Sequence, residues 1–365
     1  MQTNWRNNHF LHLDKPLLFG LLLLSGIGLF VLYSAGDQNL DLMLRQMLRL
    51  LVGFGIMLLL AQIQIQHIVR WIPWLYLGVI VLLILVLAIG EVSNGSQRWL
   101  NIGLFRFQPS EVMKLAVPLM VTWYFADKAL PPNYGRLLLA ILIITIPVIL
   151  VSMQPDLGTS LLIASSGLFV LLLAGISWRI IFGITTLGTL LAPIFWIFIL
   201  HEYQKERIRT LFYPEKDPLG AGYHIIQSKI AIGSGGVYGK GWLNGTQSHL
   251  QFLPERTTDF IFAVYSEEFG LIGVLVLLSI YIFILARGVY IAIHAQDTFS
   301  RLLVGSLILT FFVYIFVNMG MVIGLLPVVG LPLPLISYGG TSIVTLMAGF
   351  GLIMAVHTHR RFLSS

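Results

Sequence analysis

The chain contains no cysteine, which excludes disulfide bonds, thiol nucleophiles and thiolate metal sites. Charged residues are scarce: they make up 10% of the 365 residues, whereas 57% are hydrophobic, and the mean hydropathy is +0.88. Soluble domains carry about 25% charged residues. The composition therefore predicts an all-α polytopic membrane protein. No small-residue cleavage site follows the first apolar run, so we expect its helix to be retained.

Ten apolar windows approach the length of about 20 residues that a spanning helix needs. They are residues 17–35, 42–61, 72–90, 110–126, 137–153, 157–174, 179–200, 259–286, 302–326 and 338–357. An even number of spans puts both termini on one side of the membrane. The loops on that side hold most of the short-loop cations, namely Arg6, Lys15, Arg70, Lys128, Arg136, Arg179, Arg287, Arg301, Arg360 and Arg361. The positive-inside rule therefore predicts cytoplasmic termini.

The long polar segment 201–258 follows the seventh window. On this topology it is an extracytoplasmic loop between helices 7 and 8 of a single membrane domain, 1–365. Apolar residues at helical spacing predict a short interfacial helix over 223–232. The segment leads directly into Asp259 at the start of an apolar helix, and long loops of this kind are usually functional.

Prolines and glycines interrupt the apolar stretch 326–342, between helices 9 and 10. This stretch cannot be continuous helix, so we expect a re-entrant segment or a tight turn. Irregular backbone at membrane depth is tolerated where protein or a water-filled cavity covers it. Ser337, Gly339 and Gly340 could offer hydroxyl and N–H groups there.

Ionisable residues in or near spans are costly and are therefore candidates for function. Glu111 and Lys114 lie three residues apart on one helical face, which predicts an ion pair that acts either as a structural clamp or, with Arg106, as an anion contact. Asp156 precedes an apolar helix and is expected to cap it. Packing is the favoured role for Glu267 and Glu268. Asp259 alone could be a helix-start acid or an ion-pair partner of Arg256.

Five segments, in the same order over essentially the whole chain, resemble the rod-shape branch of the SEDS family (shape, elongation, division, sporulation). They are residues 106–111 (RFQPSE), 154–159 (QPDLGT), 217–224 (DPLGAGYH), 252–260 (FLPERTTDF) and 332–340 (PLPLISYGG). Several motifs in a fixed order are far more specific than any one of them alone.

The resemblance implies a peptidoglycan glycosyltransferase that polymerises lipid II into β-1,4-linked glycan strands and releases polyprenyl pyrophosphate, for cell elongation and rod shape. It implies an active site on the outer face of the bacterial cytoplasmic (inner) membrane. It also implies a class B penicillin-binding transpeptidase and the larger elongation complex as partners. Asp259 matches the family's essential acid and would act as general base on the acceptor's 4-hydroxyl.

The remaining site residues follow from that chemistry. A departing pyrophosphate needs cations or N–H donors, and a sugar ring can stack on an aromatic side chain. We expect substrate-binding roles for Arg45, Arg98, Trp99, Arg106, Gln108, Glu111, Lys114, Asp156, Lys240, Ser337, Gly339 and Gly340. A divalent cation on the pyrophosphate is compatible with this chemistry, although no ligand cluster demands one.

Two other functions fit the composition. A lipid II flippase needs a polar path through both leaflets, whereas the candidate charges here gather on the outer side. A membrane scaffold for the transpeptidase would leave Asp259 with a purely structural role.

Overall fold

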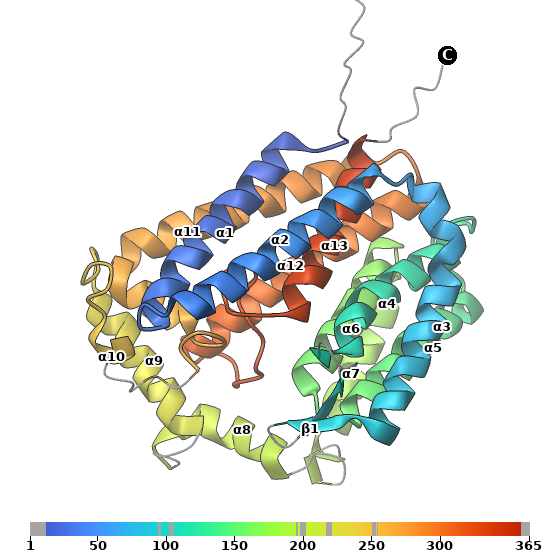
Figure 1. Cartoon of the computed structure of the whole chain (residues 1–365). Helices are drawn as coiled ribbons and strands as arrows, with labels where there is room; N and C mark the ends of the chain where they lie inside the picture. Colours follow the sequence, from blue (N-terminus) through green and yellow to red (C-terminus); the bar gives the residue numbers. More distant parts are fainter. Residues whose placement is uncertain are drawn as a thin grey trace, which may run out of the picture.

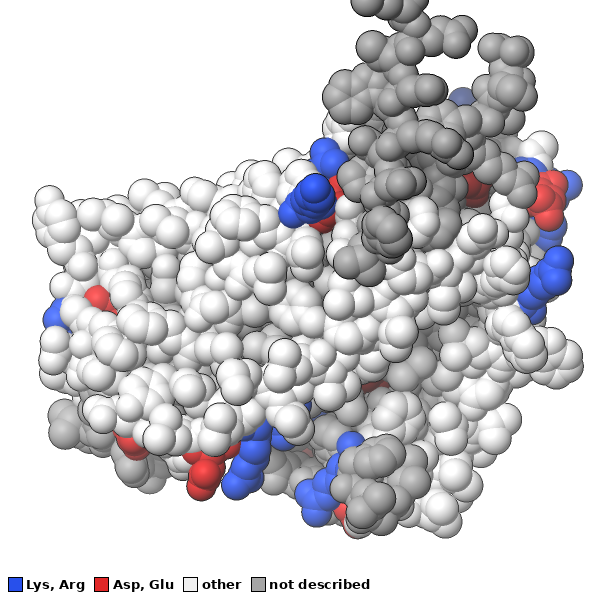
Figure 2. Space-filling model, turned by 45° about the horizontal axis from the view of Figure 1, so that its top comes forward, with Lys and Arg blue, Asp and Glu red and all other residues white. Residues whose placement is uncertain are grey.

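The computed structural model describes residues 12–93, 96–101, 106–194, 196–197, 202–216, 221–249, 253 and 255–358. This part of the chain folds as a helical bundle with a small three-stranded antiparallel sheet at one end (Figure 1). Helix α1 begins and helix α13 ends together at the other end of the bundle, at the top of Figure 1. Figure 2 shows a broad uncharged band across the middle of the surface, with charged side chains toward the edges.

Each predicted window contains a helix, and the part of the seventh window at residues 195 and 198–200 lies outside the described residues. These helices are α1 (Lys15–Ala35), α2 (Leu40–Gln62), α3 (Ile65–Ile89), α4 (Pro109–Phe125), α5 (Tyr134–Ser152), α6 (Leu157–Leu173), α7 (Trp178–Ile194), α11 (Ile261–Ile293), α12 (Thr298–Val322) and α13 (Thr341–Thr358). Among the described helices, seven are long and apolar enough to cross a membrane: α1, α2, α3, α5, α11, α12 and α13. Helices α4, α6 and α7 have 17 residues each. The prediction of a multi-pass membrane protein is confirmed.

Helix α12 lies at the centre of the bundle and packs against α11, α6 and α4. Side-chain oxygens cap several helix starts: Asp14, Asn39, Asn133, Asp156 and Asp297 each accept from a backbone N–H of the first turn. These caps satisfy donors that have no intrahelical partner. The sheet consists of β1 (Glu91–Ser93), β2 (Ser96–Asn101) and β3 (Arg106–Phe107), between α3 and α4.

The polar segment 201–258 is largely helical where it is described. It contains α8 (Glu202–Phe212), a 3-10 turn (Pro214–Lys216), α9 (Ala221–Gly235) and α10 (Thr246–His249). The predicted helix over 223–232 is confirmed within α9. Helix α8 was not predicted, because it carries charged pairs in place of an apolar stripe: Lys205 Nζ lies 2.8 Å from Glu202 Oε1 and Arg209 Nη1 lies 3.5 Å from Glu206 Oε2.

Helix α11 is broken at Gly270, whose φ is +62°. Four backbone hydrogen bonds join the turn 236–241 to the residues on either side of this break. The N–H groups of Lys240 and Gly241 donate to the carbonyls of Glu267 (3.0 Å) and Glu268 (2.9 Å), while those of Leu271 and Ile272 donate to Gly236 (3.0 Å) and Val237 (3.1 Å). A Cβ on Gly239 would lie 2.1 Å from the Glu268 carbonyl oxygen, so only glycine fits there. Residues 261–269 thus form a separate first piece of α11.

The segment 323–340 is not helical, and its later part, from Leu331 to Ser337, is mostly buried. Leu333, Leu335, Ile336 and Ser337 are buried. Helix α1 approaches it closely, since a Cβ on Gly28 would stand 2.3 Å from the carbonyl oxygen of Leu335. The predicted re-entrant segment is confirmed as irregular backbone covered by protein.

Candidate active site

Asp259 lies in the turn 255–260, which leads into α11. Three neighbours fix the backbone of this turn. The Ser337 hydroxyl donates to the Thr258 carbonyl (2.6 Å), the Tyr338 N–H donates to the Thr257 carbonyl (2.8 Å), and Asn318 Nδ2 of α12 donates to the carbonyl of Asp259 itself (2.9 Å). The re-entrant segment and the central helix therefore hold the backbone of this turn at residues 257–259.

The charge around the Asp259 carboxyl suits a proton acceptor. Burial raises its pKa to about 6, with a further upward contribution from Glu255 and an opposing one from Arg207 of α8. The group is therefore mainly ionised at pH 7, yet more basic than an ordinary aspartate. The predicted partner Arg256 pairs instead with Asp37, in the α1–α2 connection.

Gly330 lies beside the Asp259 carboxyl. Its φ is +76°, and a Cβ there would stand 3.4 Å from Asp259 Oδ2. The left-handed conformation explains the glycine, because an L side chain is strained there by about 1–2 kcal/mol.

Replacing Gly330 with alanine should therefore lower both stability and activity. The backbone strain is expected to cost about 1–2 kcal/mol, and the added methyl group presses on the Asp259 carboxyl. Gly175→Ala is the matched control, because Gly175 has a φ of +86° but its Cβ would meet only Pro131, at 3.7 Å. Both variants should unfold at lower temperature, and only Gly330→Ala should lose activity beyond its loss of folded protein. Equal activity in the two variants would contradict the placement of Gly330.

A second polar cluster lies around Asp156, at the start of α6. Asp156 caps α6 by accepting from the Thr159 N–H (3.1 Å), and it also accepts from Gln108 Nε2 (3.2 Å). Arg98 of β2 has its Nε 3.6 Å from Asp156 Oδ2. A Cβ on Gly158 would lie 2.8 Å from the carbonyl oxygen of Val329, next to Gly330. The predicted cap is confirmed, and Gly158 beside this cluster and Asp259 both lie next to residues 329–331.

The predicted ion pair between Glu111 and Lys114 is confirmed. Lys114 Nζ lies 2.6 Å from Glu111 Oε1, and each residue is 5% exposed. Thr345 of α13 donates to Glu111 (3.4 Å), and Lys114 Nζ lies 5.1 Å from the ring centre of Tyr314 of α12. The pair joins α4, α12 and α13 as a clamp. Lys114 also borders a mainly apolar pocket between these helices, and its contact with a ligand stays a prediction.

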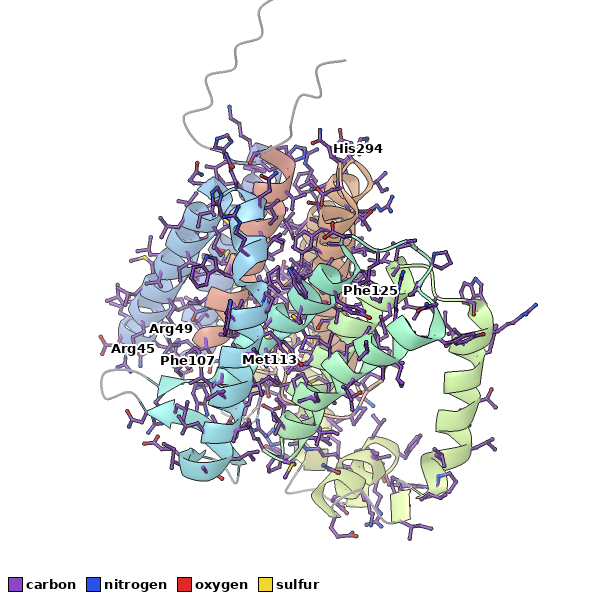
Figure 3. All side chains as sticks on the ribbon, turned by 90° about the vertical axis from the view of Figure 1, so that its right-hand side faces the viewer. Arg45, Arg49, Phe107, Met113, Phe125 and His294 are labelled. Atoms are coloured by element: carbon purple, nitrogen blue, oxygen red, sulfur yellow. The ribbon has the colours of Figure 1, made fainter. Side chains whose placement is uncertain are left out.

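Two arginines of α2 lie at the same end of the bundle. Figure 3 labels Arg45 and Arg49, which are four residues apart in the N-terminal half of α2. Arg45 is exposed, whereas the Arg49 guanidinium lies 4.4 Å from the centre of the Tyr338 ring and about 4.0 Å from the position of a Cβ on Gly340. Arg49 was not among the predicted residues.

Two predicted donors of the re-entrant segment have internal partners. The Ser337 hydroxyl holds the Asp259 turn, and the Gly339 N–H donates to Gln46 Oε1 of α2 (3.4 Å). These groups therefore bond to protein groups in this structure, and their direct contact with a ligand stays a prediction.

Three other predicted residues contact protein groups outside the Asp259 turn. Arg106 is an exposed residue whose Nε lies 3.4 Å from Glu91 Oε2, and Trp99 is half-buried opposite Glu91 in the β1–β2 ladder. Lys240 Nζ donates to Glu267 Oε1 (2.7 Å) and Thr246 Oγ1 (2.7 Å). Its partners are thus protein groups.

Sequence reasoning missed two buried amides that organise the site. Asn318 donates both to Asp259 O and to Leu331 O (2.7 Å), and Gln46 Nε2 donates to Ser337 O (3.0 Å). The available signal was the presence of single amides within apolar helices, since polar groups in spans usually have partners. In the described ranges, no three His, Asp or Glu side chains gather in a way that could hold a metal ion.

Comparison with known proteins agrees with this architecture. Residues 8–362 match the model of the FtsW, RodA and SpoVE family, described as cell cycle proteins. The chain is 54% identical to the peptidoglycan glycosyltransferase MrdB of Escherichia coli K12, covering 97% of this chain and 95% of that one. It is 30% identical to the peptidoglycan glycosyltransferase RodA of Treponema pallidum, covering 95% and 98%.

Solved structures give the same result. A chain from a peptidoglycan synthase complex, studied for the coordination of polymerization and crosslinking, superposes with a TM-score of 0.83 at 30% identity, covering 94% of this chain and 97% of that one. The rod shape determining protein RodA of Thermus thermophilus superposes with a TM-score of 0.72 at 27% identity, covering 95% and 98%. The chain belongs to the FtsW, RodA and SpoVE family of cell cycle proteins, and so to the SEDS proteins that its motifs resemble.

Proposed function

We propose that the chain is a peptidoglycan glycosyltransferase that polymerises lipid II into β-1,4-linked glycan strands, releases polyprenyl pyrophosphate and serves cell elongation and rod shape. The observation that carries this proposal is the Asp259 turn: its backbone is held by Ser337, Tyr338 and Asn318, and its carboxyl has a pKa raised to about 6. The names of the relatives support the activity.

The proposed chemistry assigns the acid to the acceptor sugar. Its 4-hydroxyl must lose a proton as the oxygen attacks the anomeric carbon of the donor. The Asp259 carboxylate takes that proton, while the bond from the anomeric carbon to the pyrophosphate oxygen breaks and its electron pair leaves with the pyrophosphate. Attack from the face opposite the leaving group converts an α-linked donor into a β-1,4 bond without a covalent sugar–enzyme intermediate.

The leaving pyrophosphate needs positive charge that the bundle can present. Arg49 lies over the ring of Tyr338 in the re-entrant segment, and Arg45 precedes it by four residues in α2. Arg98 lies beside Asp156 at the start of α6. Arginine binds phosphate oxygens in a fixed, bidentate geometry. We assign these three residues to the pyrophosphate, and Gln108 and Asp156 to the sugars beside them.

The proposed orientation places this site on the outer face of the cytoplasmic membrane. The end of the bundle where α1 begins and α13 ends would then be cytoplasmic, in agreement with the excess of Lys and Arg in its loops. The proposed partners are a class B penicillin-binding transpeptidase and the elongation complex. The likeness to a chain of a peptidoglycan synthase complex supports such a partner.

Purified protein with its transpeptidase partner, given lipid II in detergent, tests the activity. The expected product is a ladder of glycan strands on a gel. Proteoliposomes that carry labelled lipid II in one leaflet test the alternatives. Lipid scrambling without polymer would indicate a flippase, and neither product, with intact transpeptidase binding, would indicate a scaffold.

A further inference from the structure

Glu267, in the first piece of α11, binds residues of the segment 240–247. Its side chain is fully buried, at 0% exposure. A single oxygen, Oε1, accepts from Lys240 Nζ (2.7 Å), Thr246 Oγ1 (3.0 Å) and the Gln247 N–H (3.1 Å). The other oxygen, Oε2, is buried and has no hydrogen-bond partner among the described residues. One carboxylate therefore fixes residues 240–247, and Lys240 supplies the charge that balances it.

The same segment holds the break in α11. Residues 236–241 form backbone hydrogen bonds on both sides of Gly270. These bonds replace the helical hydrogen bonds that are missing at the break, and so they connect the first piece of α11 to the rest of the helix. We call residues 236–247 the splint. Its backbone bonds and the Lys240–Glu267 pair together fix one end of residues 261–269.

Asp259, the proposed general base, lies just before the other end of residues 261–269. Asp259 and Glu267 are eight residues apart, which corresponds to roughly 12 Å along a helix. Lys240 in its observed pair is therefore distant from the reacting groups. The backbone of the Asp259 turn is held at one end by Ser337, Tyr338 and Asn318, and at the other end it continues into this helical piece. A displacement of the piece at Glu267 therefore changes the orientation of Asp259 relative to Gly330.

We propose that Lys240 is a positioning residue: through its ion pair with Glu267 it holds the first piece of α11, and so sets the place of Asp259 in the site. This inference rests on the proposed glycosyltransferase function. It differs from the role expected from the sequence, in which Lys240 binds the pyrophosphate directly. The two roles predict different kinetics, because a positioning defect lowers kcat whereas loss of a ground-state contact raises KM.

The test compares Lys240→Met, Lys240→Arg and Lys240→Met/Glu267→Gln with wild type, in steady-state polymerisation of lipid II. Lys240→Met should lower kcat about 10- to 100-fold, as small misplacements of catalytic groups do, with KM for lipid II within about twofold. Lys240→Arg keeps the ion pair and should retain most of the activity. Lys229→Met, at an exposed lysine of α9, is the matched control and should behave as wild type.

The double variant separates positioning from folding. Lys240→Met alone leaves a buried, unbalanced carboxylate and should unfold at lower temperature. With Glu267→Gln added, the thermal midpoint should recover while kcat stays low. Wild-type kcat in Lys240→Met, a rise confined to KM, or full recovery of kcat in the double variant would each overturn the inference. Lack of polymer from wild type would instead refute the proposed function.

Discussion

Replacing Asp259 with asparagine is expected to abolish most polymerisation while the protein stays folded. Loss of a general base lowers rates about 10²- to 10⁴-fold. The substitution keeps the shape of the side chain, and the hydrogen bond from Asn318 uses the backbone carbonyl, which is unchanged. Steady-state polymerisation of lipid II with the transpeptidase present measures the effect, and it should appear in kcat.

The stability of Asp259→Asn should not fall, although its activity should. The pKa of the folded Asp259 is raised above its ordinary value, so the ionised form is disfavoured by folding at neutral pH. Removing the charge should leave the thermal midpoint unchanged or higher. Asp41→Asn, at an exposed acid in the first turn of α2, is the matched control: it should leave polymerisation unchanged and lower the thermal midpoint slightly, because an anion at a helix start is stabilising. Undiminished polymerisation by Asp259→Asn would remove Asp259 from the chemistry.

Replacing Lys114 with methionine should cause the largest loss of stability. It leaves Glu111 buried without its cation, and breaking one partner of a buried pair costs about 3–5 kcal/mol. The double variant Glu111→Gln/Lys114→Met removes both charges and keeps an acceptor for Thr345. It should recover most of the loss, because a buried pair replaced by neutral groups of similar volume is often tolerated.

The measurement is thermal unfolding in detergent of both variants and wild type. The loss should be large in Lys114→Met and small in the double variant. A Lys114→Met protein as stable as wild type would show that Glu111 is protonated or that water reaches the pair, and the clamp joining α4, α12 and α13 would be refuted.

The parts of the fold that depend on local pattern could be predicted from the sequence. A helix that faces lipid or a core needs an apolar stretch of suitable length, and each predicted window contains a helix. In the Glu111–Lys114 pair and in the Asp156 cap, the two interacting residues are only three positions apart in the sequence. The Pro and Gly content of 326–342 was sufficient to exclude a helix. Such features are set by spacing and by local hydrogen bonding.

The arrangement of the site depends on contacts between distant segments, which no local pattern contains. Arg256 pairs with Asp37, Gln46 with Ser337, and Asn318 with the Asp259 carbonyl, across separations of 219, 291 and 59 residues. The break at Gly270 lies in a mostly apolar stretch and has no local sequence signal. The hydrogen bonds that satisfy its backbone come from the splint, which is distant in sequence. The family resemblance singled out Asp259, but only the fold shows what holds it.

The pH dependence of kcat/KM tests most directly whether Asp259 acts as a base. The free enzyme should lose kcat/KM as the pH falls through about 6, because protonation of Asp259 removes the proton acceptor. Glu255→Gln removes a negative neighbour and should move this limb to lower pH, whereas Arg207→Gln removes a positive one and should move it to higher pH. These opposite shifts are the predicted result. An acidic limb that stays in place in both variants would contradict the assignment of Asp259 as the general base.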